Sequence, residues 1–221
     1  MNIVTPAESI DLMTLADIKL ALNVPPTTTN YDPAISMFIT NVSDELATMA
    51  GWRPQRQGFG KPQVTETFYD ISQQQQRLYL TRWPTSMADI VSMTDGFGNN
   101  LLANPDWFLE EKTGILYKGP SAATPYWSGQ VTVTYSGGYD LPDDAPPALK
   151  ALCIVMTREA YYEMVRGAIL SGIRMISHKS ARVMYYPTGV QGVVLGRGVP
   201  ASAAAQRAIY DVLGHFSRYW V

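Results

Sequence analysis

The sequence has little of the side-chain chemistry that enzymes and metalloproteins use. It contains one cysteine, Cys153, and two histidines, His178 and His215, in 221 residues. A single cysteine excludes an intrachain disulfide framework and any site built from several thiolates. Neither a His-Glu-x-x-His motif nor another ligand spacing typical of zinc or calcium sites occurs. We therefore expect no bound metal.

Charge is also scarce. Lys, Arg, Asp and Glu make up 16% of the residues, against about 25% in an ordinary soluble domain. Hydrophobic residues account for 46%, which is enough for a sizeable core and excludes disorder of the whole chain. No uncharged apolar run approaches the roughly 20 residues that span a bilayer, so no membrane partner is expected. The low charge, with 13 Tyr, 5 Trp and 10 Met, predicts that other subunits cover much of the surface.

Catalytic motifs are missing as well. Asp211 and His215 are four residues apart on a predicted helix, a spacing more typical of a surface hydrogen bond than of a catalytic triad. Cys153 falls on an apolar helix face and is interpreted as a core residue. The glycines from residue 189 to residue 198 lack the Lys-Ser/Thr that completes a phosphate-binding loop. We predict a protein that is not an enzyme and binds no cofactor.

The charge that is present is divided along the chain. Residues 1–165 carry 10 Lys and Arg against 18 Asp and Glu, a net charge of −8, and residues 166–221 carry 7 against 1, a net charge of +6. This division predicts that the last quarter faces an acidic protein or nucleic acid, or folds back onto the acidic part of its own chain. No DNA-reading motif occurs, so any DNA contact would be passive. The candidates for facing DNA are Arg174, Lys179, Arg182 and Arg197.

Helix signals occur on both sides of a central segment. Thr14 and Asp17 have the spacing of a capping box. Asp32-Pro33 is expected to start a second helix, with Asp32 as the N-cap, and Gly51 to end it. A third helix is expected after the Asp-Asp-Ala-Pro-Pro sequence of residues 143–147. The apolar stripes of the second and third helices should form the helical core: Ile35, Phe38, Ile39, Val42 and Leu46 against Leu149, Leu152, Cys153 and Met156.

Between these helices the pattern changes to alternation of apolar and polar residues, with Gly and Pro every few positions. This predicts a small antiparallel β-domain. The fold class is therefore α+β: a discontinuous helical bundle with an inserted small antiparallel β-domain, followed by an extended C-terminal arm plus helix. The expected division is a first helical part (1–60), the β-domain (61–140), a second helical part (141–179) and the C-terminal arm and helix (180–221).

In this order of elements the chain resembles the head-tail connector (adaptor, or head-completion) proteins of tailed double-stranded DNA bacteriophages. The resemblance covers about residues 10 to 165. It rests on these segments: Leu15-Ala-Asp-Ile-Lys19, Leu78-Tyr-Leu80 with Trp83-Pro84, Ile90-Val-Ser-Met-Thr-Asp-Gly96, Asp106-Trp-Phe-Leu109 with Gly114-Ile-Leu116, Val131-Thr-Val-Thr-Tyr-Ser-Gly-Gly-Tyr139 with Leu141-Pro142, and Ala148-Leu-Lys-Ala-Leu152. Beyond Arg166 no segment matches.

The resemblance implies a structural virion protein that forms a ring of identical subunits, commonly twelve, on the portal. Such a ring extends the DNA channel and provides the attachment platform for the tail. The implied partners are other copies of the chain, the portal protein, a tail or tail-completion protein and the packaged double-stranded DNA. The implied location is the head-tail interface of the virion, and the host cytoplasm during assembly. The alternatives are a tail-completion or other tail-proximal structural protein, and a non-enzymatic nucleic-acid-binding module.

The C-terminal segment is the expected contact with the portal. A helix over residues 201–220 would carry an apolar stripe that ends in aromatic side chains at the chain terminus, where they could fill a groove of a partner. The alternative is that this helix completes the chain's own bundle. The candidate portal-binding residues are Arg207, Phe216, Arg218, Tyr219 and Trp220.

Overall fold

The computed structural model describes residues 1–52, 57–103, 106–119, 126–170, 175–178, 181–184 and 210–217. The chain divides into two compact units. The β unit comprises Met1–Ile10 and Gln55–Asp144, and the helical unit comprises Asp11–Pro54 and Ala145–Val221. Helices and antiparallel sheets are both present, which confirms the predicted α+β class.

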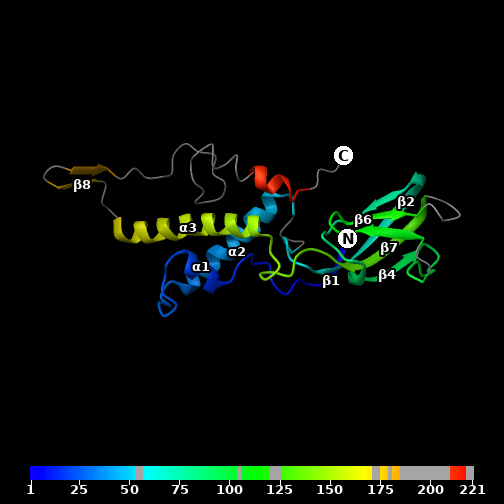
Figure 1. Cartoon of the computed structure of the whole chain (residues 1–221), viewed down its shortest axis with the longest axis horizontal. Helices are drawn as coiled ribbons and strands as arrows, with labels where there is room; N and C mark the ends of the chain where they lie inside the picture. Colours follow the sequence, from blue (N-terminus) through cyan, green and yellow to red (C-terminus); the bar gives the residue numbers. More distant parts are fainter. Residues whose placement is uncertain are drawn as a thin grey trace. The chain divides into compact units, whose positions relative to one another are not determined.

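The helical unit is built on α1 (Leu15–Ala21), α2 (Asp32–Met49) and α3 (Pro147–Leu170), which contact one another (Figure 1). The hydroxyl of Thr14 accepts the backbone N–H of Asp17 at 3.1 Å, so the predicted cap of α1 is confirmed. Gly51, with φ 82°, follows the C-cap of α2 in the left-handed conformation that favours glycine. Asp32 differs from expectation: it is the first residue of α2, and Tyr31 is the N-cap.

The side chain of Asp32 instead pairs with a buried lysine. Lys19 is 5% exposed, and its ammonium lies 2.8 Å from the Asp32 carboxylate. It also donates to the backbone carbonyls of Pro26 and Thr28, at 3.0 and 2.7 Å. Lys19 has three hydrogen-bond donors, and each has a partner here. This cluster fixes the connection between α1 and α2.

Helices α2 and α3 pack through the apolar stripes that the sequence predicts. The buried members of the two stripes are Ile35, Ile39, Val42, Leu46, Leu149, Cys153 and Met156. Two members differ from expectation, because Phe38 and Leu152 are only half-buried. The buried side chains of the two stripes are therefore aliphatic or contain sulfur, and they come from both helices.

The β unit consists of two antiparallel sheets, with strand orders β1-β2-β7-β4 and β3-β6-β5. The strands are β1 (Asn2–Thr5), β2 (Gln63–Gln75), β3 (Arg77–Tyr79), β4 (Ile90–Asp95), β5 (Trp107–Glu110), β6 (Ile115–Lys118) and β7 (Trp127–Ser136). Alternation along β7 places Val131, Val133 and Tyr135 in the core. On its other face Thr134 hydrogen-bonds Thr65 of β2 at 2.9 Å.

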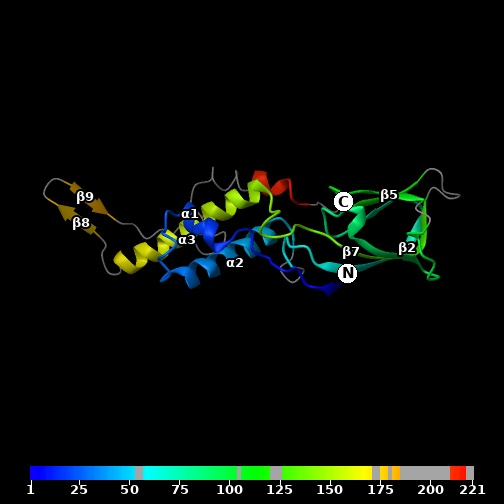
Figure 2. The ribbon, with the colours of Figure 1, turned by 60° about the horizontal axis from the view of Figure 1, so that its bottom comes forward.

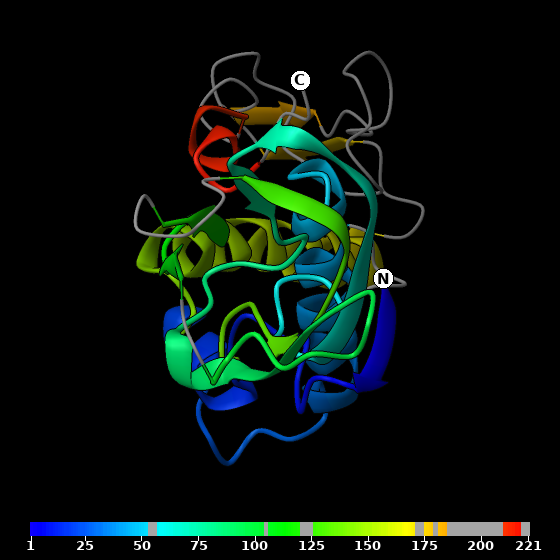
Figure 3. The same cartoon turned by 90° about the vertical axis from the view of Figure 1, so that its right-hand side faces the viewer.

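Strand β1 was not expected, because the sequence-based division places residues 1–60 in the helical part. In the structure Asn2 pairs with Thr65 and Ile3 with Val64, so this strand forms the edge of the four-stranded sheet beside β2 (Figure 3). All four residues of β1 are exposed, so this strand lacks the alternation of buried apolar and exposed polar residues by which a strand is recognised in a sequence. The pairing with β2 is what defines the strand.

The sequence also did not predict a hairpin that follows α3. The sequence suggests that the helical part continues to residue 179, whereas α3 ends at Leu170 and residues 175–184 contain β8 (Met175–His178) and β9 (Ala181–Met184) (Figure 2). These strands pair antiparallel, with Met175 opposite Met184. The glycine-rich part of the predicted arm lies outside the described residues.

Candidate functional site

Two of the predicted binding residues lie in segments that the structure describes. Phe216 belongs to the described C-terminal segment, and Arg182 belongs to the backbone of β9. The others lie outside the described residues: Arg174, Lys179, Arg197, Arg207, Arg218, Tyr219 and Trp220.

The C-terminal segment of residues 210–217 is attached to the helical unit. Leu213 is 2% exposed, whereas Tyr210 is 51% exposed. The indole N–H of Trp52, which follows α2, donates to the backbone carbonyl of Phe216 at 2.9 Å. This part of the predicted helix therefore completes its own bundle. Docking on the portal stays a prediction for the candidate residues on both sides of this segment, Arg207 before it and Arg218, Tyr219 and Trp220 after it.

The structure describes the three side chains considered for catalysis: Cys153, Asp211 and His215. Cys153 is fully buried, and burial raises the pKa of its thiol to about 11, so the thiol is protonated near neutral pH and is a poor nucleophile. Asp211 and His215 are both exposed. Within the described ranges, no group of three or more His, Cys, Asp and Glu is placed to hold a metal ion. No helix in that part of the chain is long and apolar enough to cross a membrane.

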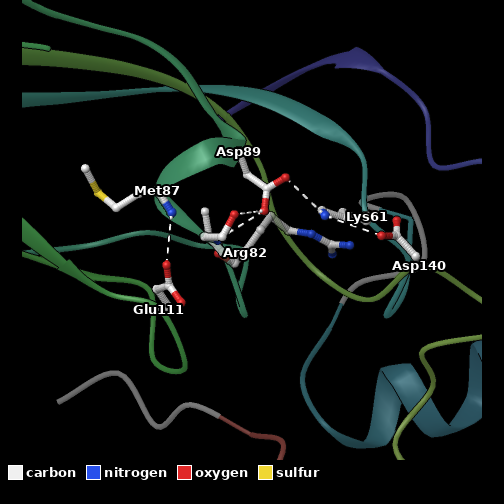
Figure 4. A network of polar contacts seen from close by, with 8 residues as sticks. Lys61, Arg82, Met87, Asp89, Glu111 and Asp140 are labelled. Atoms are coloured by element: carbon white, nitrogen blue, oxygen red, sulfur yellow. Dashed lines mark hydrogen bonds and ion pairs between the residues drawn. The ribbon is translucent and has the colours of Figure 1, made fainter.

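A polar network in the β unit is built around a buried arginine, Arg82, whose side chain is drawn in Figure 4. Arg82 is 2% exposed. Its guanidinium donates to the carbonyls of Gly58 at 2.7 Å, of Gly137 at 3.3 Å and of Gly60. The guanidinium of an arginine presents five N–H donors in a fixed planar fork, which suits carbonyls spread around it better than the single ammonium of a lysine. Arg82 thus joins the segment before β2 to the residue that follows β7.

A carboxylate and a phenol extend this network into the sheet. The Tyr135 hydroxyl donates to Glu66 at 3.0 Å and accepts the backbone N–H of Arg82 at 3.0 Å. Glu66 also accepts the backbone N–H of Thr81 at 3.1 Å. Burial, and then the charge of Glu66, raise the pKa of Tyr135 well above its ordinary value of 10, so the phenol remains a donor. These contacts bind β2 to β7 and serve the fold.

At the surface of the β unit, Lys61 lies between two carboxylates (Figure 4). Its ammonium is 3.1 Å from Asp89 and 3.4 Å from Asp140. Burial lowers the pKa of Lys61, but hydrogen bonds and charge from the two carboxylates outweigh burial and leave it raised. Asp89 is itself held by the hydroxyl of Ser86 at 2.7 Å. The lysine and both aspartates therefore form an ion-pair cluster with a formal net charge of −1, in which the Asp140 side chain is 72% exposed.

Exposed aromatic side chains give the β unit a surface suited to protein contacts. On the sheet β3-β6-β5, the rings of Phe108 and Tyr117 stack at 4.7 Å, and the Arg77 guanidinium lies 5.2 Å from the centre of the Tyr117 ring. Phe97, after β4, is 95% exposed. Aromatic and arginine side chains are enriched at interfaces. Neither Phe97 nor Arg82 could be identified from a motif in the sequence, although the glycines on both sides of Phe97 are a signal for an exposed turn.

No family model matches the chain, and no curated protein matches it. Solved structures do share its fold. One similar chain belongs to the virion of a native gene transfer agent particle, with a TM-score of 0.54, 12% identity and coverage of 100% of this chain and 96% of that chain. Another belongs to the neck of an empty gene transfer agent particle computed with C6 symmetry, with a TM-score of 0.53, 13% identity and coverage of 100% and 96%. The chain thus has the fold of a component of a gene transfer agent particle over its full length.

Proposed function

We propose that this chain is a structural protein of a tailed phage or phage-like virion, and that it acts as the head-to-tail adaptor of the neck. In this role it forms a ring on the portal, extends the DNA channel and provides the platform for the tail. The observation that carries the proposal is the full-length fold similarity to a chain of a gene transfer agent neck. The order of elements that resembles adaptor proteins supports it independently.

A ring of twelve copies agrees with several features of the chain. The similar neck structure was computed with C6 symmetry, and a twelve-subunit ring contains a six-fold axis. The low charged fraction of 16% suits a surface that other copies cover. Exposed aromatic side chains on the β unit, including Phe97 and Phe108, are suited to such contacts.

The contact with the portal is assigned to the end of the chain. Trp52 and Leu213 attach the segment of residues 210–217 to the helical unit, and this attachment would place the residues that follow at a fixed starting point. Residues 166–221 carry a net charge of +6, which complements an acidic partner. The proposed portal contacts are Arg207, Arg218, Tyr219 and Trp220, with Phe216 at the boundary.

The positive charge of residues 166–221 also supports a contact with DNA. The proposed passive contacts with DNA in the channel are Arg174, Lys179, Arg182 and Arg197. Such contacts would bind phosphates without reading sequence, so their strength should fall steeply with salt. If the chain were a nucleic-acid-binding module outside the virion, this salt-dependent binding would be its main activity.

The proposal is tested by adding the full chain to portal-containing heads that lack tails. We expect the chain to co-sediment with the heads and to form a ring at the portal vertex in negative-stain images. Deletion of residues 218–221 should abolish attachment and leave the circular dichroism spectrum unchanged, whereas Leu20→Ala, at a position 79% exposed on α1, should attach normally. If the chain stays monomeric, does not bind the heads and binds DNA in a salt-sensitive way, the proposal is contradicted. That result would favour the nucleic-acid-binding module.

A further inference from the structure

The outward face of α3 carries a mostly apolar stripe with one positive charge. Ala151, Val155, Arg158 and Tyr162 recur at intervals of four, three and four residues, and all four are exposed. At about 100° per residue they lie on one line along the helix, opposite the buried Cys153. Val155 is 37% exposed and Tyr162 is 40% exposed. Because a helix with apolar side chains on both faces is normally covered on both, this outer stripe of α3 indicates a partner.

The outward face of α2 carries a stripe with the same spacing and the opposite charge. Its members, on the side of the helix opposite the buried residues, are Met37, Asn41, Asp44 and Thr48. Met37 is 53% exposed, Asn41 and Thr48 are exposed, and Asp44 is half-buried. Asp44 is the only charged member of this outer stripe of α2, and it occupies the third position, as the arginine does on α3. The two stripes are therefore complementary in charge.

The two charges are separated within one chain. Neither Asp44 nor Arg158 takes part in an ion pair among the described residues. Helices α2 and α3 pack on each other through their buried faces (Figure 2), and each outer stripe lies on the opposite side of its helix. The stripes therefore point away from each other, so Asp44 and Arg158 of the same chain do not meet. A pair between them requires a second copy.

Charge decides which stripe meets which. If the outer stripe of α3 packed on the same stripe of a second copy, the two Arg158 side chains would come together, and the outer stripe of α2 would likewise bring two Asp44 side chains together. Like charges that face each other in a covered interface cost binding free energy. The outer stripe of α2 against that of α3 brings opposite charges together instead. Such a contact between two different surfaces joins copies head to tail, and a closed ring leaves neither stripe exposed.

We propose that in the assembled ring the outer stripe of α2 of each copy packs on the outer stripe of α3 of the next copy, with Asp44 of one paired to Arg158 of the other. In either direction of the helices, the neighbours of Asp44 on its stripe then face Val155 and Tyr162. This inference rests on the proposed ring function and names the surface that joins neighbouring helical units.

The contact can be tested by reversing one charge at a time in the full chain. In Asp44→Lys rings a lysine would face Arg158, and in Arg158→Glu rings a glutamate would face Asp44. Each variant alone should therefore need at least about tenfold more chain to form rings than the unmodified protein. An equimolar mixture of the two variants should recover ring formation, because alternating copies bring opposite charges together at every contact. Sedimentation velocity and negative-stain images follow ring formation, for the free chain and on portal-containing heads.

Matched controls make the same charge changes elsewhere. Asp144→Lys and Lys112→Glu, at exposed positions of the β unit, should form rings like the unmodified chain, alone and mixed. The double variant Asp44→Lys/Arg158→Glu should also form rings, since each contact again joins opposite charges, and this shows that both substitutions are compatible with the fold. Rings from either single variant at the concentration of the unmodified chain, or a mixture that does not recover, would overturn the contact.

Attachment to the heads separates this inference from the proposed function. If the unmodified chain and the mixture form rings, the single variants do not, and no ring binds the heads, the contact is supported and the neck role is contradicted. If the single variants attach to the heads as rings at the concentration of the unmodified chain, the contact is overturned and the neck role stands. An unmodified chain that forms rings neither free nor on heads would overturn both.

Discussion

The indole nitrogen of Trp52 donates a hydrogen bond to the backbone carbonyl of Phe216, 2.9 Å away and 164 positions later in the sequence. Trp52 follows the end of α2 and is 6% exposed. This contact ties the described C-terminal segment to the helical unit. It therefore divides the positively charged tail into a part held by its own subunit and a remainder assigned to partners.

Replacing Leu213 with alanine tests whether the C-terminal segment belongs to the cooperative helical unit. Leu213 is 2% exposed, so its truncation should lower the free energy of unfolding by about 2–5 kcal/mol, measured by denaturant titration. Tyr210→Ala, three residues earlier and 51% exposed, is the control and should change stability by less than about 0.5 kcal/mol. Equal effects of the two substitutions would show that the segment is not packed as described.

Arg82→Lys should destabilise the β unit even though it keeps the charge. A lysine cannot reach the three carbonyls of Gly58, Gly60 and Gly137 together, and each buried acceptor left without a donor costs about 1–3 kcal/mol. We expect a loss of about 3 kcal/mol or more in the free energy of unfolding. The control is Arg77→Lys, at an exposed position, which should be nearly neutral for stability. Similar melting temperatures for the two variants would contradict the role assigned to Arg82.

The pairing of Asp89 with Lys61 predicts a specific dependence of stability on pH. Burial raises the pKa of Asp89, but hydrogen bonds from Ser86 and Lys61 outweigh burial and leave it below the ordinary value of 3.8. A lowered carboxyl pKa stabilises the fold above pH 3.8, and this contribution is lost as the pH falls through the lowered value. Lys61 loses its contribution only as the pH rises through its raised pKa, above 10.5.

The measurement compares Asp89→Asn with the unmodified chain across pH. The difference in unfolding free energy should stay constant between about pH 5 and pH 9 and should shrink below about pH 3.8. Asp106→Asn, at an exposed carboxylate, serves as the control. If the difference in unfolding free energy between the two proteins were largest at low pH, it would contradict the lowered pKa of Asp89.

Two residues of α2 test the position of the helical core. Ile39 is 2% exposed and Met37 is 53% exposed. Ile39→Ala should cost about 2–5 kcal/mol and Met37→Ala less than about 0.5 kcal/mol, as measured by thermal unfolding. The sequence placed Phe38 on the core stripe with Ile39, but Phe38 is half-buried, so its truncation should cost less than that of Ile39. The reverse order would contradict the helix packing described for α2.

Local patterns predicted the elements whose formation depends on neighbouring residues. Thr14 and Asp17 could be recognised as a cap because the interaction spans three positions. The alternation of Val131, Val133 and Tyr135 predicted the buried face of β7 because strand geometry sets that period. Strand β1 could not be predicted in this way, since its four exposed residues form a strand only by pairing with β2.

Parts of the candidate site were not predicted for the same reason: they depend on contacts that form only when the chain folds. Arg82 has no sequence pattern, because its partners are backbone carbonyls of Gly58, Gly60 and Gly137, brought together by folding. The contact between Trp52 and Phe216 links the first segment of the helical unit's sequence to its last residues, 164 positions away. Phe97 lies between two glycines, but its exposure of 95% is set by the folded loop, in which Asp95 accepts the Phe97 backbone N–H.

The central claim, that the chain is a ring-forming protein of the virion neck, is tested most directly by locating it in assembled particles. Electron microscopy would compare particles assembled with the full chain, with and without a small protein tag, and particles assembled without the chain. The account predicts tag density in a ring between head and tail, and DNA-filled heads without tails when the chain is absent. Tag density elsewhere in the particle, or normal tailed particles in the absence of the chain, would contradict it.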